Sequence, residues 1–192
     1  MKFTTLAVMA TIAPVFATPV FANEYAPAMS AYLEAEIRHW VQSPILVDAI
    51  NAQNQKTGSY DQSVIDRLDQ AWRSEIGTPS TPTITPVIEN AAADFLRGQV
   101  LASGGQVTEI FIMDALGLNV ASSGIISDMW QGDEAKFSAT YSVGPDAVHL
   151  GNVELDESTQ SYQGQISLTI TDPATGLSIG AITIGIDAEF LI

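Results

Sequence analysis

The chain contains no cysteine among its 192 residues. Without thiols it can form no disulfide framework, and zinc–thiolate centres, iron–sulfur clusters and cysteine nucleophiles are excluded. The fold must therefore rest on its hydrophobic core alone. A chain of this length with 46% apolar residues is long and apolar enough to supply that core in one domain.

Basic residues are also scarce. Lys and Arg number 7 against 22 Asp and Glu, which gives a formal net charge of -15. This balance repels nucleic acid and anionic lipid, so we expect neither as a partner. The simplest explanation of this net charge is that an exported protein has a generally acidic surface. A second explanation is that the acidic surface binds a basic surface of a partner protein.

No apolar run reaches the roughly 20 residues that a membrane span needs, because Thr and Pro residues interrupt the most apolar segment. That segment, MKFTTLAVMATIAPVFATPVFA, instead combines Lys2, an apolar stretch and small residues at its end, as a secretory signal peptide does. We expect a signal peptide over residues 1–22, cleaved after Ala22. The remaining single domain, residues 23–192, would be exported, periplasmic and soluble.

The first half of the sequence carries helical patterns. Apolar residues spaced by three and four between Tyr25 and Val41 predict a long N-terminal helix, and Ser43-Pro44 predicts a kink or restart. An amphipathic helix is predicted from about Val64 to Gly77, followed by the proline-rich connector TPSTPTITP. One further helix is predicted from Thr85 to the SGG sequence at residues 103–105.

From residue 107 onwards the pattern changes to strands. VTEIFIMD and GLNVASS flank a turn at Asp114–Gly117, which predicts a β-hairpin. SYQGQISLTIT alternates apolar and polar residues, and the turn Asp172–Gly176 leads into LSIGAITIGID, where a slip at Gly180-Ala181 predicts a β-bulge. With a short helix from about Asp133 to Tyr141, the predicted class is α+β.

The segment SDMWQGDEAKF, residues 127–137, is the first candidate for a binding site. Trp130 and Tyr141 could wall a pocket in which Asp128 or Asp133 accepts hydrogen bonds from a polar ligand. The structural alternative is that Asp133 caps a helix and Trp130 fills the core. The residues alone leave both interpretations open.

Motifs for catalysis and metal binding are missing. The histidines, His39 and His149, stand in no triad, HExxH or HxH spacing, and GxSxG and phosphate-binding glycine loops are absent. The acidic group Glu154, Asp156 and Glu157 lacks the spacing of a calcium loop. We expect no enzymatic activity, no metal and no cofactor, with a small hydrolase built on acidic residues as a remote alternative.

Three segments in order resemble the exported PAS-like sensor modules called Cache or PDC sensor domains. They are FIMDALGLNVASS, SDMWQGDEAKF and VELDESTQSYQGQISLTITDPATGLSIGAITIGID, and SPILVDAINAQN fits the N-terminal helix of that family. The resemblance implies a long N-terminal helix and further helices packed on a central antiparallel sheet of about five strands. It also implies a small-molecule pocket on the sheet face, with Trp130, Asp128 and Tyr141 as pocket residues and Tyr162 and Lys136 as weaker choices.

The resemblance implies a function as well. Pockets of this family commonly bind organic acids, amino acids or amines. Most such modules lie between transmembrane helices and precede a cytoplasmic signalling domain, whereas this sequence ends at Ile192. We therefore expect a free-standing protein that reports or delivers a metabolite to a membrane receptor or kinase. The alternative is a ligand-independent docking or accessory protein whose pocket is filled by Trp130 and Tyr141.

Overall fold

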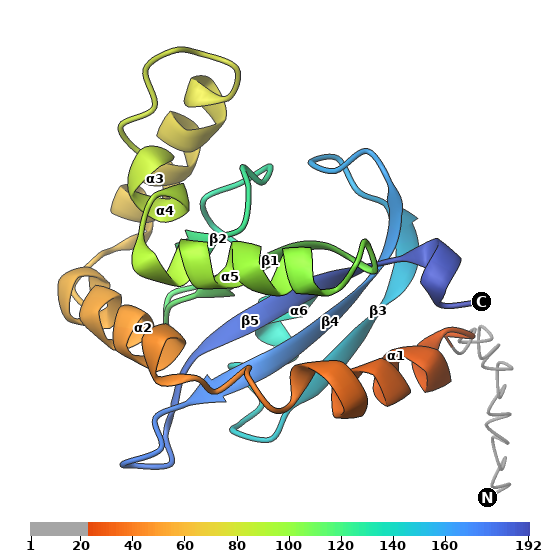
Figure 1. Cartoon of the computed structure of the whole chain (residues 1–192). Coiled ribbons are helices and arrows are strands. Elements are labelled where there is room, and N and C mark those ends of the chain that lie inside the picture. The colour runs from red at the N-terminus through yellow and green to blue at the C-terminus, as the bar shows by residue number, and fades with distance from the viewer. Residues whose placement is uncertain (1–22) are drawn as a thin grey trace, which may run out of the picture.

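A five-stranded antiparallel sheet with the strand order β2-β1-β5-β4-β3 forms the centre of the structure (Figure 1). The computed structural model describes residues 23–192, so the expected signal peptide lies outside the described residues. The strands are β1 Val107–Met113, β2 Asn119–Ser122, β3 Val148–Leu155, β4 Tyr162–Thr171 and β5 Ser178–Asp187. The predicted α+β class and the sheet of about five strands are confirmed.

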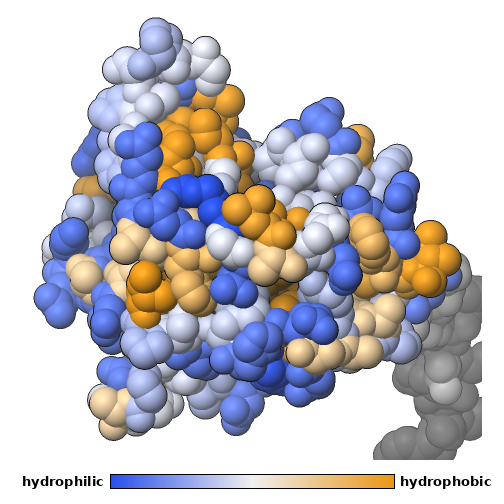
Figure 2. Space-filling view, viewed as in Figure 1, coloured by the Kyte–Doolittle hydropathy of each residue, from blue (hydrophilic) through white to orange (hydrophobic). Residues whose placement is uncertain are grey.

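Helices cover one face of this sheet. The helical elements are α1 Ala26–Tyr32, the π-helical turn η1 Leu33–Ile37, α2 Pro44–Thr57, α3 Gln62–Glu75, α4 Thr85–Ile88, α5 Ala91–Ala102, α6 Ala135–Ser138 and the 3₁₀ turn η2 Ala188–Phe190. Of these, α1, α2 and α5 lie across the front of the sheet and α6 lies behind it (Figure 1). On this front surface apolar residues are scattered among polar ones (Figure 2).

The main core lies between the front helices and one face of the strands. Alternation along β4 and β5 directs Ile166, Leu168, Ile182 and Ile184 into it, where they are buried with the apolar side chains of α1, η1, α2 and α5. Burial of these large side chains contributes about 1.5–3 kcal/mol each. The alternating pattern of β4 therefore predicted correctly which of its residues face the helices.

Two predicted helices are interrupted. The N-terminal helix ends at Ile37 rather than near Val41, and the chain turns before α2 starts at Pro44. The helix predicted from Thr85 onward breaks into α4 and α5 at Asn90, whose Oδ1 accepts from Ala93 N at 2.9 Å. Its Nδ2 donates to Pro86 O at 2.8 Å, so one side chain ends α4 and caps α5. No described helix is long and apolar enough to cross a membrane.

A second apolar cluster covers part of the opposite face of the sheet. It joins Trp72 of α3 to Phe111 and Met113 of β1 and to Phe137 of α6. The Trp72 indole Nε1 donates to Ile126 O at 2.7 Å, which fixes α3 against the chain that follows β2. This packing covers the β2–β1 side of the face, whereas β4 and β3 present Ser167, Gln165 and other polar residues there.

The predicted hairpin is present, and a β-bulge lies just before its predicted position at Gly180-Ala181. β1 and β2 pair around the turn at Asp114–Gly117, and the β4–β5 register shifts between Ile170 and Thr171, opposite Ser178–Gly180. At Gly180 the chain passes so close to β1 that an added Cβ would overlap the backbone O of Met113. A glycine is required at this position because the obstacle is backbone, which cannot rotate away.

We predict that Gly180→Ala destabilises the protein by about 1–3 kcal/mol, because the added methyl group displaces β5 from β1. The control is Gly98→Ala in α5, where an added Cβ meets no atom within 4 Å. That change should stabilise by about 0.5–1 kcal/mol through helix propensity. Denaturant unfolding measures both, and equal stability of Gly180→Ala and the unmodified chain would contradict the close approach.

Candidate functional site

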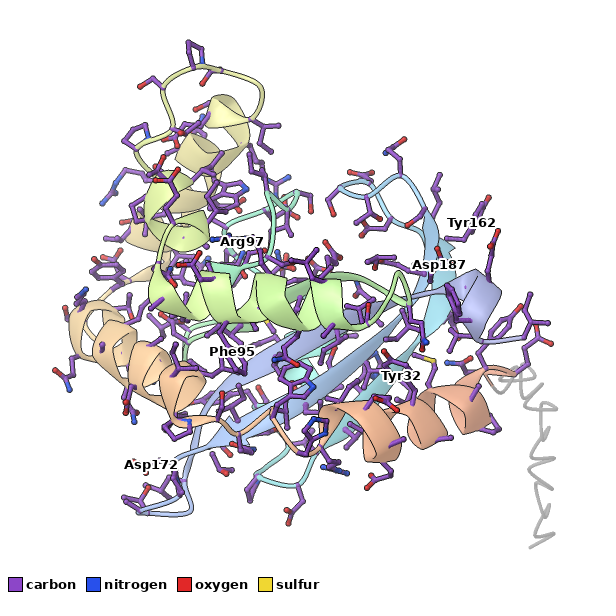
Figure 3. The ribbon with its side chains drawn as sticks, viewed as in Figure 1. Tyr32, Phe95, Arg97, Tyr162, Asp172 and Asp187 are labelled. Atoms are coloured by element: carbon purple, nitrogen blue, oxygen red, sulfur yellow. The ribbon has the colours of Figure 1, made fainter. Side chains whose placement is uncertain are left out.

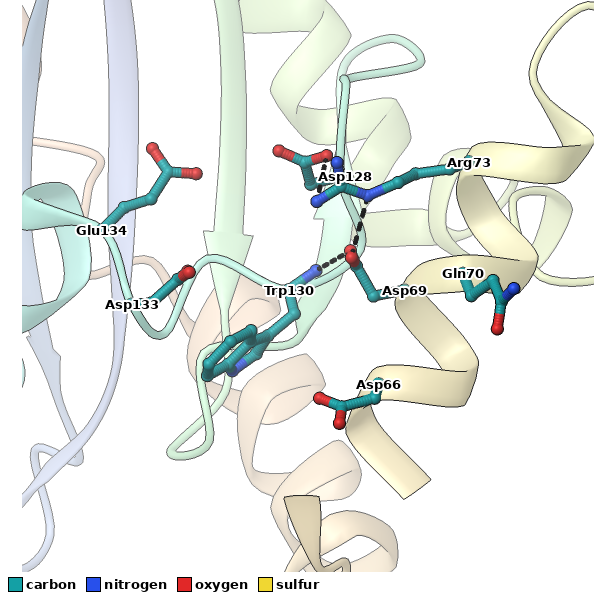
Figure 4. Close-up of a pocket in the computed structure, with 8 residues that line it drawn as sticks. All are labelled: Asp66, Asp69, Gln70, Arg73, Asp128, Trp130, Asp133 and Glu134. Atoms are coloured by element: carbon teal, nitrogen blue, oxygen red, sulfur yellow. Dashed lines mark hydrogen bonds and ion pairs between the residues drawn. The ribbon is translucent and has the colours of Figure 1, made fainter. Parts of the chain in front are cut away.

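The chain between β2 and β3 borders two clefts. The first, the α3 cleft, has a volume of about 370 Å³ and lies between α3 and residues 128–134 (Figure 4). The second, the sheet cleft, has a volume of about 750 Å³ and lies along β3 and β4. Asp128 and Glu134 line both clefts, so one loop, residues 127–134, forms a wall of each.

Asp69 of α3 holds this loop in place. Its Oδ1 accepts from the backbone N of Met129 at 3.0 Å and of Trp130 at 3.1 Å. Its Oδ2 lies 2.9 Å from Nε of Arg73, one helical turn further along α3, and Arg73 Nη2 lies 2.9 Å from Asp128 Oδ1 (Figure 4). These contacts join the loop to α3 through the backbone of two consecutive residues and through the side chain of Asp128.

Trp130 combines the two roles that the sequence left open. Its indole ring packs against the second apolar cluster, and its Nε1 donates to Leu116 O at 2.8 Å. The same half-buried ring lines the α3 cleft. Gly132 lies directly against the ring, where a Cβ would overlap it. Trp130 is therefore a rigid wall, held by packing and by one hydrogen bond.

Asp133 does not cap a helix, so this part of the structural alternative is wrong. The residue before α6 is Glu134, which makes no side-chain capping bond, and α6 starts only at Ala135. Asp133 is exposed and lines the α3 cleft with Asp66, Asp69, Asp128 and Glu134. Five carboxylates thus line this cleft together with Arg73, which pairs with Asp69 and Asp128, and with one aromatic ring. Such a surface attracts organic cations, because the ring face and the carboxylates are both negative.

The sheet cleft has a different composition. Lys136, His149, Gln163 and Gln165 line it, and acidic residues of β3 and of the following turn also border it. Lys136 Nζ lies 3.0 Å from Glu134 Oε2 and 5.4 Å from the centroid of the Phe111 ring. This ammonium group is the positive charge available to an acidic ligand group on the sheet face.

The six candidates from the sequence fall into four places. Trp130, Asp128 and Asp133 come together in the α3 cleft, and Asp128 meets Lys136 in the sheet cleft. Tyr141 stacks on Phe137, with ring centroids 5.1 Å apart, and lines neither cleft. Tyr162 is exposed at the start of β4, near the C-terminal end of β5 (Figure 3). Among residues 23–192, no three acidic or histidine side chains are placed as metal ligands.

Sequence reasoning missed Glu109, a carboxyl group that is only 4% exposed. Its Oε1 accepts from Gln163 Nε2 at 2.8 Å, and its Oε2 accepts from Ser158 Oγ at 2.9 Å. Gln163 reaches it across β5 at Gly185, where any side chain would overlap the carboxamide. The available signal was the charge of Glu109 in a strand that is otherwise apolar apart from Thr108.

Burial raises the pKa of Glu109 above its ordinary value, and the nearby Asp156 carboxylate raises it further. The hydrogen bonds from Gln163 and Ser158 and the charge of Lys136 offset part of that rise in pKa. Asp156 behaves differently: burial alone would raise its pKa, but hydrogen bonds from Ser158 and Thr159 outweigh burial, and its pKa lies below the ordinary value. The two carboxyl groups therefore titrate in separate pH ranges.

Comparison with known proteins shows a likeness of fold. No family model matches the sequence, and no curated protein matches it. The sensor domain of the V. cholerae histidine kinase DctB matches with a TM-score of 0.50 and 17% identity, over 87% of this chain and 53% of that one. The sensory domain of the Campylobacter jejuni chemoreceptor Tlp3, solved with isoleucine bound, matches with a TM-score of 0.43 and 13% identity, over 90% of this chain and 66% of that one.

This chain thus spans about half of the DctB sensor domain and has the fold of Cache or PDC sensor domains. The fold implied by the sequence resemblance is confirmed, including the helices packed on an antiparallel sheet.

We predict that Glu109→Gln stabilises the protein increasingly as the pH rises above about 4.5, the ordinary pKa of a glutamate. The folded chain binds this proton more tightly than the unfolded chain does, so the contribution of Glu109 to stability is lost as the pH rises through that range. Glutamine keeps the shape and carries no charge. Unfolding free energies between pH 4 and pH 8 test this, with exposed Glu89→Gln as the control. A Glu109→Gln effect independent of pH would contradict the raised pKa.

Proposed function

We propose that this chain is an exported sensor domain that binds a small metabolite and reports or delivers it to a membrane signalling protein. The observation that carries the proposal is the pair of adjoining clefts, which share Asp128 and Glu134 on a loop fixed by Asp69. The likeness of fold to the DctB sensor domain supports it. In this proposal residues 1–22 are a signal peptide, residues 23–192 form one domain, the protein is periplasmic, and it is not an enzyme.

The charges in the clefts narrow the ligand to three classes: organic acids, amino acids and amines. In the sheet cleft Lys136 offers an ammonium group to a carboxylate, and Gln163 and Gln165 offer amide groups for hydrogen bonds. In the α3 cleft Trp130 and the carboxylates suit an amine. An amino acid carries both groups and could use the two sides of the loop that separates the clefts.

Glu134 gives binding a route to a structural change. It pairs with Lys136 and lines both clefts, so a ligand carboxylate that takes over Lys136 releases Glu134. The released carboxylate lies directly before α6, the short helix behind the sheet. Movement of Glu134 and of α6 then alters the exposed surface beside α3, while Asp69 keeps Met129 and Trp130 in place. A membrane partner that reads this surface would respond to ligand, since only a difference in affinity between two states can carry a signal.

We predict that a thermal-shift screen of the exported protein against small carboxylates, amino acids and amines gives a reproducible hit. A ligand at about 100 times its Kd stabilises by roughly 2.7 kcal/mol, which is several degrees for a domain of this size. Calorimetry should confirm the hit. If no compound in the library binds, a ligand-independent docking protein is favoured instead. Separately, mass spectrometry of the exported chain would show whether it begins at Asn23.

We further predict that Lys136→Met weakens a ligand that carries a carboxylate at least tenfold, because one charge-assisted contact is lost. The control is Lys56→Met at the exposed end of α2, on the opposite side of the sheet. Asp133→Asn, with exposed Asp48→Asn as its control, tests the amine side in the same way. Unchanged affinity in both Lys136→Met and Asp133→Asn would remove these two clefts as the ligand site.

A further inference from the structure

A third cleft lies where the edge of the sheet is open. β2 pairs with β1 only from Phe111 to Met113, so the first residues of β1 have no β2 partner. A groove of about 350 Å³ occupies this place, between α5 and the turn that joins β3 to β4. We call it the β1-edge groove. It shares no lining residue with the α3 cleft or the sheet cleft, so it is a separate cleft.

The walls of the β1-edge groove are apolar and open to solvent. Leu101, in the last turn of α5, is 81% exposed, and Ile125, after β2, is 44% exposed. Val100, which is half-buried, also lines the groove. Neither exposed side chain belongs to the two apolar clusters of the protein. The two can lose water only to a group that enters the groove, and each methylene buried in this way contributes about 0.8 kcal/mol.

The floor of the groove holds Glu109, the buried carboxyl group described above. Ser158 and Gln163 each give it one neutral hydrogen bond. Within residues 23–192, no Lys, Arg or His nitrogen lies within 4 Å of it. A buried carboxylate without a cationic partner is costly, and each of its oxygens can accept further hydrogen bonds.

Among the described residues, no charged group around the groove pairs with the Glu109 carboxylate. Asp156 adds negative charge, and Lys136 acts on Glu109 only from a distance. Arg97 lines the groove from α5 (Figure 3), but its guanidinium is bonded to Asp94 and to Ile88 O. A cationic ligand therefore finds a carboxylate here that no cation of the described residues pairs with, whereas an anionic ligand would face the Glu109 carboxylate.

We propose that the β1-edge groove is a second ligand site, which binds a primary amine on a short aliphatic stem. The ammonium group reaches Glu109, and the stem lies between Leu101 and Ile125. The groove volume is at the lower end of the range for small-molecule pockets, which suits a ligand of few carbon atoms. This site goes beyond the proposed sensor function and does not depend on it.

The test uses n-pentylamine as the probe, with pentan-1-ol and pentanoate as matched molecules that lack the positive charge. Calorimetry at pH 8 should show saturable binding of the amine and at least tenfold weaker binding of the other two. Glu109→Gln should weaken the amine at least tenfold, whereas exposed Glu89→Gln should not. Leu101→Asn should weaken it severalfold without loss of stability. Leu177→Asn is its control, because Leu177 is a similarly exposed leucine in the β4–β5 turn.

Three results would overturn the proposal: no saturable binding of the amine, equal binding of the alcohol, or full affinity in Glu109→Gln. If Asp133→Asn weakens the amine and Glu109→Gln does not, the amine sits in the α3 cleft and the β1-edge groove is not its site. A ligand found by the thermal-shift screen should bind Glu109→Gln normally when it occupies the other clefts. Failure of this proposal and failure of the sensor function are therefore separable.

Discussion

The hydrogen bonds that Asp69 accepts from the backbone of Met129 and Trp130 determine the shape of the proposed ligand region. A loop between two strands has no regular partner of its own, so its position depends on such contacts. On its other side the loop pairs with the β1–β2 hairpin: Gln131 N donates to Gly117 O at 2.8 Å, and Asn119 N donates to Met129 O at 3.0 Å. Held from both sides, the loop keeps Trp130 and Asp128 at fixed positions in the α3 cleft. An arrangement with few internal degrees of freedom lowers the entropy lost when a ligand binds.

The second constraint comes from the polar residues of the sheet. Ser167 and Thr183 bond each other at 3.0 Å on the face away from the front helices, and both are fully buried. Near the end of the same face, Gln163 crosses β5 to reach Glu109, which Gly185 permits. Gln163 lines the sheet cleft and Glu109 lines the β1-edge groove. One carboxamide hydrogen bond therefore links a residue of the sheet cleft to a residue of the β1-edge groove, although the two clefts share no lining residue.

Most of the fold could be predicted from local sequence patterns, because strand alternation and helical spacing record which side of each element is buried. The β5 bulge is an example, since a slip in the apolar phase marks a register shift. The helix break at Asn90 was missed because an asparagine side chain can replace backbone partners at any point where tertiary packing allows it. Glu109 was missed for a related reason: its burial depends on Ser158 and Gln163, about 50 residues away, and no local pattern records such a contact. The Trp130 segment was chosen as a candidate because a tryptophan among charged residues is unusual. The sequence could not show whether its side chain lines a cleft or fills the core.

The charge distribution of the two adjoining clefts bears on how a sensor of this form would respond. Glu134 faces both clefts, and its partner Lys136 belongs to the sheet cleft. An anionic group bound at Lys136 frees the Glu134 carboxylate, which increases the negative charge at the α3 cleft. A cationic group then binds more tightly beside Trp130, and by linkage the cation strengthens binding of the anion by the same factor. A ligand that carries both charges gains from this coupling within one molecule. A ligand of one charge sign leaves Glu134 either still paired with Lys136 or facing an empty cleft, so the proposed site would bind a zwitterion more tightly than a simple acid or amine.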